Sequence, residues 1–371
     1  MYFIFMRETL RWGILGSANI ARKNWEAIKN SGNGVVTAVA SRDAAKAQCF
    51  IDECQAEVPF PDAPRAIGGY DEIVTADDVD AVYVPLPTGL REEWVIKAAK
   101  AGKHVMCEKP CAVDYETLKG MTDACEENNV QFMDGVMYMH SDRMPELREA
   151  LDDPGNVGTI KRIASAFSFC APPDFFGDNI RSNSDLEPAG ALGDLGWYTI
   201  RAILFVMNYE MPVSLRATML STASPENSPN SVPTELSAEL FFANGVSATF
   251  YNSFLTENQQ WLHVSGTKGH LRVDDFVLPF PGGNLGFEVS NLKFVQEGCR
   301  FTMENHQRSH VVEEEANNSQ DAQETKLFRT FAKLALSGSP DGFWPEISLK
   351  TQRVLDAGLV SARNSGELIK L

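Results

Sequence analysis

The sequence lacks the patterns that mark several common classes of protein. Its seven cysteines form no pair of CxxC units and its six histidines show no HExxH or similar spacing, so we expect free thiols and no metal site. Basic residues are scarce, with 33 against 50 acidic ones, and no apolar run is long enough to span a membrane. The net charge of −17 disfavours binding to nucleic acid or to an anionic membrane, because their phosphates would be repelled.

The first residues, MYFIFMRETLRW, also lack the features of a targeting signal. Only a short part of this stretch is apolar and no small-residue cleavage site follows, so it does not read as a signal peptide or a membrane span. We therefore expect a cytoplasmic protein, with Met6 as a second candidate start, and assign no function to residues 1–10.

What is present is the composition of an ordinary globular protein, with 44% hydrophobic and 22% charged residues. A chain of 371 residues exceeds what one core usually supports, so two domains are predicted. Residues 1–135 alternate short apolar runs with helical patterns, which predicts a doubly wound parallel sheet of the Rossmann type. Its five predicted strands lie within residues 10–15, 35–40, 79–87, 103–110 and 130–135.

Residues 136–371 follow a different pattern, in which long runs alternate polar and apolar residues. Such runs predict an α+β domain with a large, mostly antiparallel, open sheet. Its predicted strands lie within residues 160–169, 234–242, 245–254 and 259–276, with tight turns at 243–245 and 266–269. Helical patterns at 323–336 and 348–364 close the chain, and the polar stretches 221–233 and 313–324 are predicted surface loops.

The stretch WGILGSANIA matches the dinucleotide-binding fingerprint G-x-G-x-x-G/A with one change. Gly16 stands where the strand turns sharply into a helix, but Ala18 replaces the middle glycine. The extra methyl group narrows the approach to a pyrophosphate without closing it, and the helix still offers N–H groups and a positive dipole end. The alternative is an ordinary tight turn. The predicted pyrophosphate-binding residues are Gly16, Ser17, Ala18, Asn19 and Ile20.

The residues after the second predicted strand favour NADP over NAD. An NAD-binding chain usually has an acidic residue there for the ribose hydroxyls, whereas this sequence has Ser41 and Arg42, with Asp43 one position later. A hydroxyl and a guanidinium suit the 2′-phosphate of NADP, which arginine can bind with two hydrogen bonds. In the alternative interpretation Ser41 only caps the following helix.

The stretch CEKPCAV places Lys109 at the carboxyl end of a buried strand, the edge at which open α/β sheets bind ligands. Because the residue before a proline is pushed out of the helical region, Pro110 is expected to hold Lys109 extended toward the cleft. The alternative is an ordinary surface lysine in a loop.

A third stretch, GALGDLGWYTIR, places Asp194 and Tyr198 four residues apart, on one face of a predicted helix, with Arg181 a short loop earlier. A carboxylate, a phenol and an ammonium form a plausible set for proton transfer. Tyrosine has an unperturbed pKa near ~10, and a neighbouring lysine would favour the phenolate and lower that pKa. The alternative is a core helix with Tyr198 packed inside.

In their order and spacing these stretches resemble the glucose-fructose oxidoreductase / inositol dehydrogenase / MocA family, over residues 11–371. The match is carried by GSANIARK, AVASRD, GKHVMCEKP, NNVQFMDGVMYMH, DNIRSNSDLEPAGALGDLGWYTIRAIL and SGTKG. It is closest to the branch with NADP-dependent D-xylose dehydrogenase, trans-dihydrodiol dehydrogenase and plant relatives. The family lysine falls on Lys109, and the motif D-x-G-x-H/Y falls on Asp194, Gly196 and Tyr198. The usual histidine after the proline loop is Arg91, which is expected to change the cleft entrance or the charge preference for substrate.

The resemblance implies an NAD(P)-dependent oxidoreductase, with NADP preferred, that transfers hydride between a hydroxyl-bearing carbon of a sugar, polyol or dihydrodiol and the nicotinamide. It implies catalytic roles for Lys109, Asp194 and Tyr198 and a substrate domain that forms a homodimer or a dimer of dimers. The rival interpretation is a catalytically silent NAD(P)-binding regulatory protein on the same scaffold. Further cofactor-binding residues predicted on this basis are Pro85, Leu86, Pro87, Thr88, Glu108, Lys109 and Arg181.

Overall fold

The computed structural model describes residues 8–281 and 285–371, so Met6 and its neighbours lie outside the described residues. The chain forms two compact units, residues 1–141 with 315–352 and residues 142–314 with 353–371. The sequence pattern put the whole chain after residue 135 into one domain, whereas the structure groups residues 315–352 with the first unit. Over the described ranges, no helix has the length and apolar character needed to cross a bilayer.

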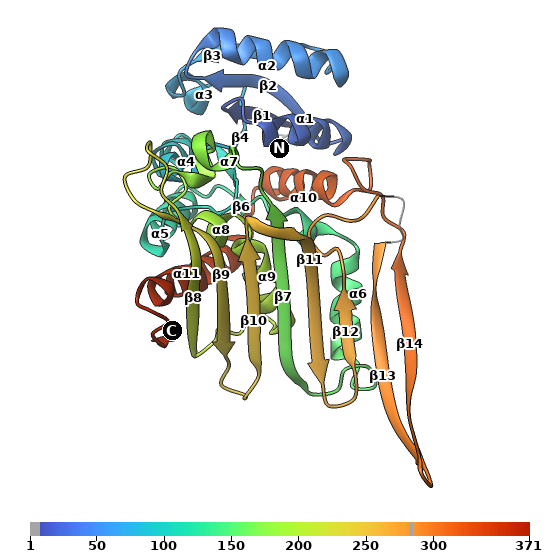
Figure 1. The fold of residues 1–371 in the computed structure, drawn as a ribbon. Coiled ribbons are helices and arrows are strands. Elements are labelled where there is room, and N and C mark those ends of the chain that lie inside the picture. Colours follow the sequence, from blue (N-terminus) through green and yellow to red (C-terminus); the bar gives the residue numbers. More distant parts are fainter. Residues whose placement is uncertain (1–7, 282–284) are drawn as a thin grey trace. The chain divides into compact units, whose positions relative to one another are not determined.

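The first unit contains a six-stranded sheet in the order β3-β2-β1-β4-β5-β6, with every pair of neighbours parallel (Figure 1). This order confirms the doubly wound Rossmann sheet. The strands are β1 (Leu10–Leu15), β2 (Gly34–Ser41), β3 (Arg65–Gly68), β4 (Ala81–Val84), β5 (His104–Cys107) and β6 (Phe132–Asp134). Five of them match the predicted runs, and the four-residue edge strand β3 was not predicted.

The helices of this unit begin and end largely where local signals put them. Asp43 accepts a hydrogen bond from the Ala45 N–H and Asp114 accepts one from the Thr117 N–H, each at 2.8 Å, so both aspartates cap the helices that follow them. Trp12 of β1 packs against Phe328 and Phe331 of α10, with ring centroids 5.3 and 4.9 Å apart, which explains why this late segment belongs to the first unit. The helices are α1 (Asn19–Asn30), α2 (Ala44–Glu57), α3 (Asp71–Thr75), α4 (Arg91–Lys100), α5 (Tyr115–Glu127) and α10 (Gln323–Ser337), with 3₁₀ turns at Thr88–Leu90 and Met137–His140.

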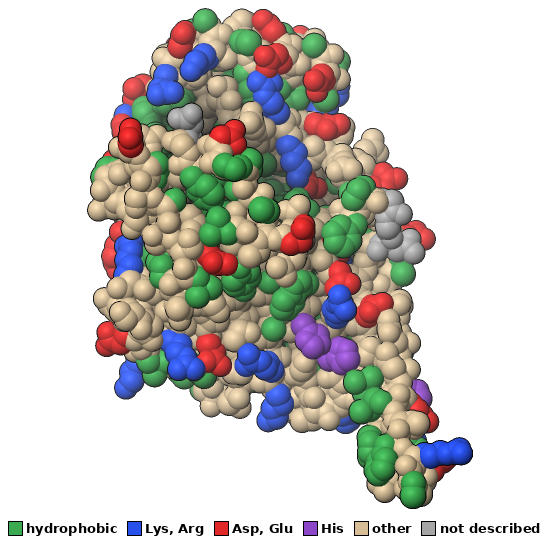
Figure 2. Space-filling model, in the orientation of Figure 1, with side chains coloured by type: hydrophobic (Ala, Val, Ile, Leu, Met, Phe, Trp, Pro, Cys, Tyr) green, Lys and Arg blue, Asp and Glu red, His purple; other side chains and the backbone are tan. Residues whose placement is uncertain are grey.

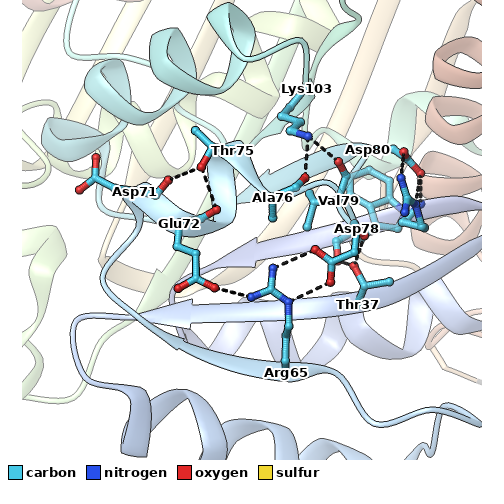
Figure 3. Close-up of polar contacts among 12 residues, drawn as sticks. Thr37, Arg65, Asp71, Glu72, Thr75, Ala76, Asp78, Val79, Asp80 and Lys103 are labelled. Carbon is cyan, nitrogen blue, oxygen red and sulfur yellow. Dashed lines mark hydrogen bonds and ion pairs between the residues drawn. The ribbon is translucent and has the colours of Figure 1, made fainter.

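At the amino end of the edge strand β3, charged residues link this strand to the segment that precedes β4 (Figure 3). Arg65, the first residue of β3, donates two hydrogen bonds of 2.8 Å to the Asp78 carboxylate and one of 2.6 Å to Glu72. The Arg65 guanidinium holds the pKa of Asp78 below its usual value. Lys103 donates to the carbonyl oxygens of Ala76 and Val79. These charges therefore hold strands together at the edge opposite to the one where Lys109 lies.

The second unit contains a nine-stranded sheet in the order β14-β13-β12-β11-β7-β10-β9-β8-β15. All pairs are antiparallel except β7 with β10, which run parallel with Ser247–Ser253 beside Arg162–Ser168, so the sheet is mostly antiparallel, as predicted. Strands β8, β13, β14 and β15 were not predicted. The strands are β7 (Ile160–Cys170), β8 (Ser214–Ala223), β9 (Val232–Phe241), β10 (Ser247–Ser253), β11 (Leu255–Gly266), β12 (His270–Val273), β13 (Leu285–Glu297), β14 (Arg300–Val312) and β15 (Ile369–Lys370).

Helices α6, α8 and α9 pack on one face of this sheet (Figure 1). The stretch GALGDLGWYTIR, predicted to form one helix, forms two, because the first helix ends at Asp194 and the second begins at Gly196. The helices are α6 (Arg143–Asp152), α7 (Phe175–Asp178), α8 (Gly190–Asp194), α9 (Gly196–Val206) and α11 (Phe343–Arg363), with a 3₁₀ turn at Ile180–Ser182. Helix α11 begins at Phe343 rather than near Ser348 and is shared between the units, which divide after Gln352.

The hairpin of β13 and β14 extends past the other strands (Figure 1). Strand β12 pairs with β13 only at residues 288–290, whereas β13 and β14 pair along their whole length. Hydrophobic side chains gather near the end of this hairpin (Figure 2). The register places them on one face of the ribbon; they are Leu292, Phe294, Phe301 and Met303, between 51% and 62% exposed.

Candidate active site

The predicted cofactor-binding residues of the first unit meet at one edge of its sheet. Strands β1, β2, β4 and β5 are parallel, so the loops that follow them all start at the carboxyl edge. The strand order reverses between β1 and β4, and doubly wound sheets bind their ligands in the crevice outside such a reversal. The fold therefore gathers Gly16–Ile20, Ser41–Arg42, Pro85–Thr88 and Glu108–Lys109 at one edge of the sheet.

The first of these loops requires glycine at its first position. Gly16 has φ +106°, a conformation that L side chains rarely adopt, and its N–H donates to the Ala40 carbonyl at 2.7 Å. A Cβ at Gly16 would lie 3.3 Å from Cδ2 of Leu86, in the loop after β4. The turn and the β4 loop therefore pack closely, which explains why the first glycine of the fingerprint is kept.

Ala18 does not need to be glycine for the backbone to fold. It has φ −68° and ψ 151°, which any residue can adopt, and it precedes α1 without making a side-chain cap. Helices α2 and α5 of the same unit both have aspartate caps. An uncapped helix start with its N–H groups and positive dipole end fits a pyrophosphate, so the residues present suit a dinucleotide.

Ser41 and Arg42 lie at the carboxyl end of β2, the strand end at which the sequence predicts the ribose of a dinucleotide. Ser41 ends β2 and is 5% exposed, while Arg42 is exposed. Asp43, and not Ser41, caps α2, so the interpretation of Ser41 as a helix cap is wrong. Both side chains therefore remain compatible with a role in binding a 2′-phosphate.

Buried polar residues hold Glu108 directly beside Lys109. The Tyr83 hydroxyl donates to Oε1 of Glu108 at 2.7 Å, and the Asn24 amide donates to Tyr83 at 2.6 Å and to Glu108 at 3.3 Å. The Lys109 N–H donates to the other carboxylate oxygen at 3.2 Å. Burial, together with Glu108, raises the pKa of Tyr83 well above its usual value, which keeps the phenol a donor. Asn24 and Tyr83 were missed, because neither belongs to a motif; Tyr83 could have been noticed as a polar group within the apolar run AVYV, whereas Asn24 stands among other polar residues.

Arg91 is buried and bonded to main-chain carbonyls, which does not fit the expectation that it changes the cleft entrance or the charge preference for substrate. Its side chain is buried, at 4% exposure, and donates to main-chain carbonyls on two loops. Nε donates to Leu86 O at 2.6 Å, and Nη1 donates to Glu108 O at 2.6 Å and to Pro110 O.

In the second unit Asp194 forms an ion pair with Arg181. Nε of Arg181 lies 2.7 Å from Oδ2 of Asp194, and the Asp194 charge raises the pKa of Arg181. Tyr198 is 7% exposed, and the Phe167 ring meets it edge-on with centroids 5.6 Å apart. The structure thus brings Arg181, Asp194 and Tyr198 together, although Asp194 ends α8 and Tyr198 lies in the first turn of α9.

An aromatic cluster, which was not predicted as part of the site, extends from Phe167. Phe169 contacts Phe254 and Phe175 with ring centroids 5.0 and 5.7 Å apart, and Phe175 contacts Phe176 at 5.4 Å. Four of its five rings are only partly buried. The five residues of this aromatic cluster are Phe167, Phe169, Phe175, Phe176 and Phe254.

A Rossmann sheet with a glycine turn, an uncapped first helix and a lysine at its carboxyl edge defines an oxidoreductase that binds a nicotinamide dinucleotide. The chain belongs to the GFO/IDH/MocA oxidoreductase family. Residues 10–136 match the family model described as an NAD-binding Rossmann fold, and residues 145–272 match the model of the family's C-terminal domain.

Relatives agree with this assignment. The chain is 31% identical, over 71% of its length and 76% of the relative, to a D-xylose 1-dehydrogenase (NADP(+)) of Haloferax volcanii. It is 26% identical to the trans-1,2-dihydrobenzene-1,2-diol dehydrogenase of Mus musculus, over 81% of this chain and 87% of the relative. A crystal structure of a 3-ketoreductase from Actinomadura kijaniata with NADP and TDP-benzene matches 95% of this chain and 98% of that one, with TM-score 0.77 and 26% identity.

Proposed function

We propose that this protein is an NADP-preferring dehydrogenase that acts on a CH–OH group of a small polyhydroxy compound. The observation that carries the proposal is the pairing of a dinucleotide turn with Ser41 and exposed Arg42, where an NAD enzyme would have a carboxylate. The naming of NADP for the D-xylose dehydrogenase and its presence in the ketoreductase crystal support this preference. Gly16–Ile20 hold the pyrophosphate, Ser41 and Arg42 the 2′-phosphate, and Pro85–Thr88, Glu108 and Arg181 contribute to the rest of the cofactor site.

Tyr198 is the proposed acceptor of the hydroxyl proton. When bound, the oxidised nicotinamide supplies the acceptor for the hydride, which leaves the carbon that bears this hydroxyl group. Lys109 contributes a positive charge that favours the phenolate form of Tyr198. Arg181 adds a second positive charge, since it lies near enough for its charge and that of Tyr198 to interact. Asp194 orients this group by fixing the Arg181 guanidinium.

The aromatic cluster beside Tyr198 favours a cyclic substrate. Partly buried rings offer an apolar wall to the C–H face of a ring, while the hydroxyls remain free for polar contacts. We therefore propose a sugar, an inositol or a trans-dihydrodiol, in keeping with the substrates named for the two dehydrogenase relatives.

The decisive experiment is a turnover screen of aldoses, inositols and trans-dihydrodiols with NADP and NAD, followed by Lys109→Met and Tyr198→Phe on the best substrate. Proton transfer by a positioned group contributes about 10²–10⁴-fold, so each variant should lose at least that much turnover while still binding NADP. The double variant should be little worse than either single one, because the two residues act as one unit. Normal turnover by Lys109→Met would show the assignment to be wrong, and tight NADP binding without turnover of any compound would favour the regulatory protein.

We further propose a cytoplasmic homodimer, or a dimer of dimers, formed through residues 234–274. Phe241, Tyr251 and Trp261 lie on the face of the sheet away from the core and are only half-buried. Half-buried aromatic residues on an open sheet are typical of an interface.

A further inference from the structure

We propose that Arg91 positions Lys109 by clamping the main-chain carbonyls of the two residues that flank it; this rests on the proposed role of Lys109. The Arg91 guanidinium donates to the carbonyls of Glu108 and Pro110, the residues immediately before and after Lys109. With both flanking carbonyls fixed, the direction in which the Lys109 side chain leaves the backbone is fixed as well.

The same guanidinium ties the Lys109 loop to the loop after β4. Its Nε donates to Leu86 O at 2.6 Å, and Leu86 is the residue that approaches the Gly16 turn. Thr88 strengthens this link, because its hydroxyl donates to Pro110 O at 3.2 Å. Arg91 thus joins the loop after β4, which packs against the Gly16 turn, to the loop after β5, which carries Lys109.

Only arginine suits this arrangement. It presents N–H donors in a rigid planar fork, which can reach carbonyls on two loops at once. A lysine keeps the charge but concentrates its donors at one flexible nitrogen, and a glutamine offers a shorter amide without charge. Glu108 supports the clamp from its other side, since its carboxylate accepts from the Lys109 N–H and is itself held by Tyr83.

The test compares Arg91→Gln and Arg91→Lys with Arg329→Gln. Arg329 also donates to three main-chain carbonyls, those of Asn30 and Ser31 at the C-terminal end of α1 and that of Gln320 just before α10, all away from the Lys109 loop. It is therefore a matched control for the loss of stability alone. Four quantities are measured for each variant: the melting temperature, the NADP Kd, turnover, and the rate of acetylation of Lys109 relative to exposed Lys100 in the cofactor-free protein, by peptide mass spectrometry.

Arg91→Gln should lose about ten- to a hundredfold in kcat, because small misplacements of a catalytic group have effects of this size. Its NADP Kd should stay within about threefold of the parent, while the acetylation rate of Lys109 changes by more than about threefold. Arg91→Lys should fall between the parent and Arg91→Gln in kcat and in the acetylation rate of Lys109. Arg329→Gln should lower only the melting temperature.

Parental turnover and parental Lys109 acetylation in a folded Arg91→Gln would overturn the proposal. If Arg91→Gln does not fold, Arg91→Lys decides in the same way. The Lys109→Met variant distinguishes the proposed function of Lys109 from the proposed role of Arg91. If it turns over normally, the proposed function of Lys109 is wrong, whereas a changed acetylation rate in the Arg91 variants would still show that Arg91 sets the position of that lysine.

Discussion

Replacing Gly16 by alanine tests the dinucleotide turn directly. The residue has φ +106°, and its new Cβ would lie 3.3 Å from Cδ2 of Leu86, so the substitution strains the backbone and requires the Leu86 side chain to move slightly. Strain of this kind costs on the order of 1–3 kcal/mol of stability. Because the same turn is proposed to hold the pyrophosphate, we expect NADP and NAD to bind at least about tenfold more weakly, equivalent to about 1.4 kcal/mol.

Gly32→Ala provides the control from just beyond the other end of the same helix. Gly32 has φ +77°, and a Cβ added there would meet no heavy atom within 4 Å, so its substitution adds backbone strain far from the turn. Both variants should lose stability in thermal unfolding, but only Gly16→Ala should lose affinity in fluorescence titrations with either cofactor. Parental cofactor affinity in a folded Gly16→Ala would refute the assignment of the turn.

Three further outcomes are expected. Arg42→Ala should weaken NADP binding by ~1–3 kcal/mol and leave NAD nearly unchanged, since only NADP has the 2′-phosphate; equal losses in calorimetric titrations with both cofactors would contradict this. Burial lowers the pKa of His104, whose Nδ1 accepts from the Gln131 N–H, so the unfolded chain binds the proton more readily. The contribution of neutral His104 to the free energy of unfolding is therefore complete above pH 6.5, and it is lost as the pH falls below 6.5, by at most about 1.4 kcal/mol per pH unit. In urea unfolding at two pH values, the free energy of unfolding should depend less on pH in His104→Gln than in the parent. An equal pH dependence in the two proteins would contradict this prediction. Light scattering should give at least a dimer at micromolar concentration, and a monomer would exclude the proposed interface.

Local signals in the sequence were sufficient for most of the first unit. Short apolar runs predicted five of its six strands, because strand periodicity depends on residues close together in the chain. The edge strand β3 was missed for the opposite reason. Its four residues have little pattern of their own, and Arg65 is held by Asp78 and Glu72 from a later segment.

In the candidate site, too, some residues could be predicted from local motifs, whereas their partners could not. Gly16, Ser41, Arg42, Lys109, Asp194 and Tyr198 could be named from the sequence, because each stands in a short motif whose chemistry is local. Other contacts at the site join segments that no single motif contains: Arg91 binds the carbonyls around Lys109, and Tyr83 binds Glu108. The sequence by itself determined which chemical groups the protein carries and on which kind of sheet. Only the tertiary structure decided which buried donors hold those groups, because hydrogen bonds and ion pairs select partners by distance in space and not by separation along the chain.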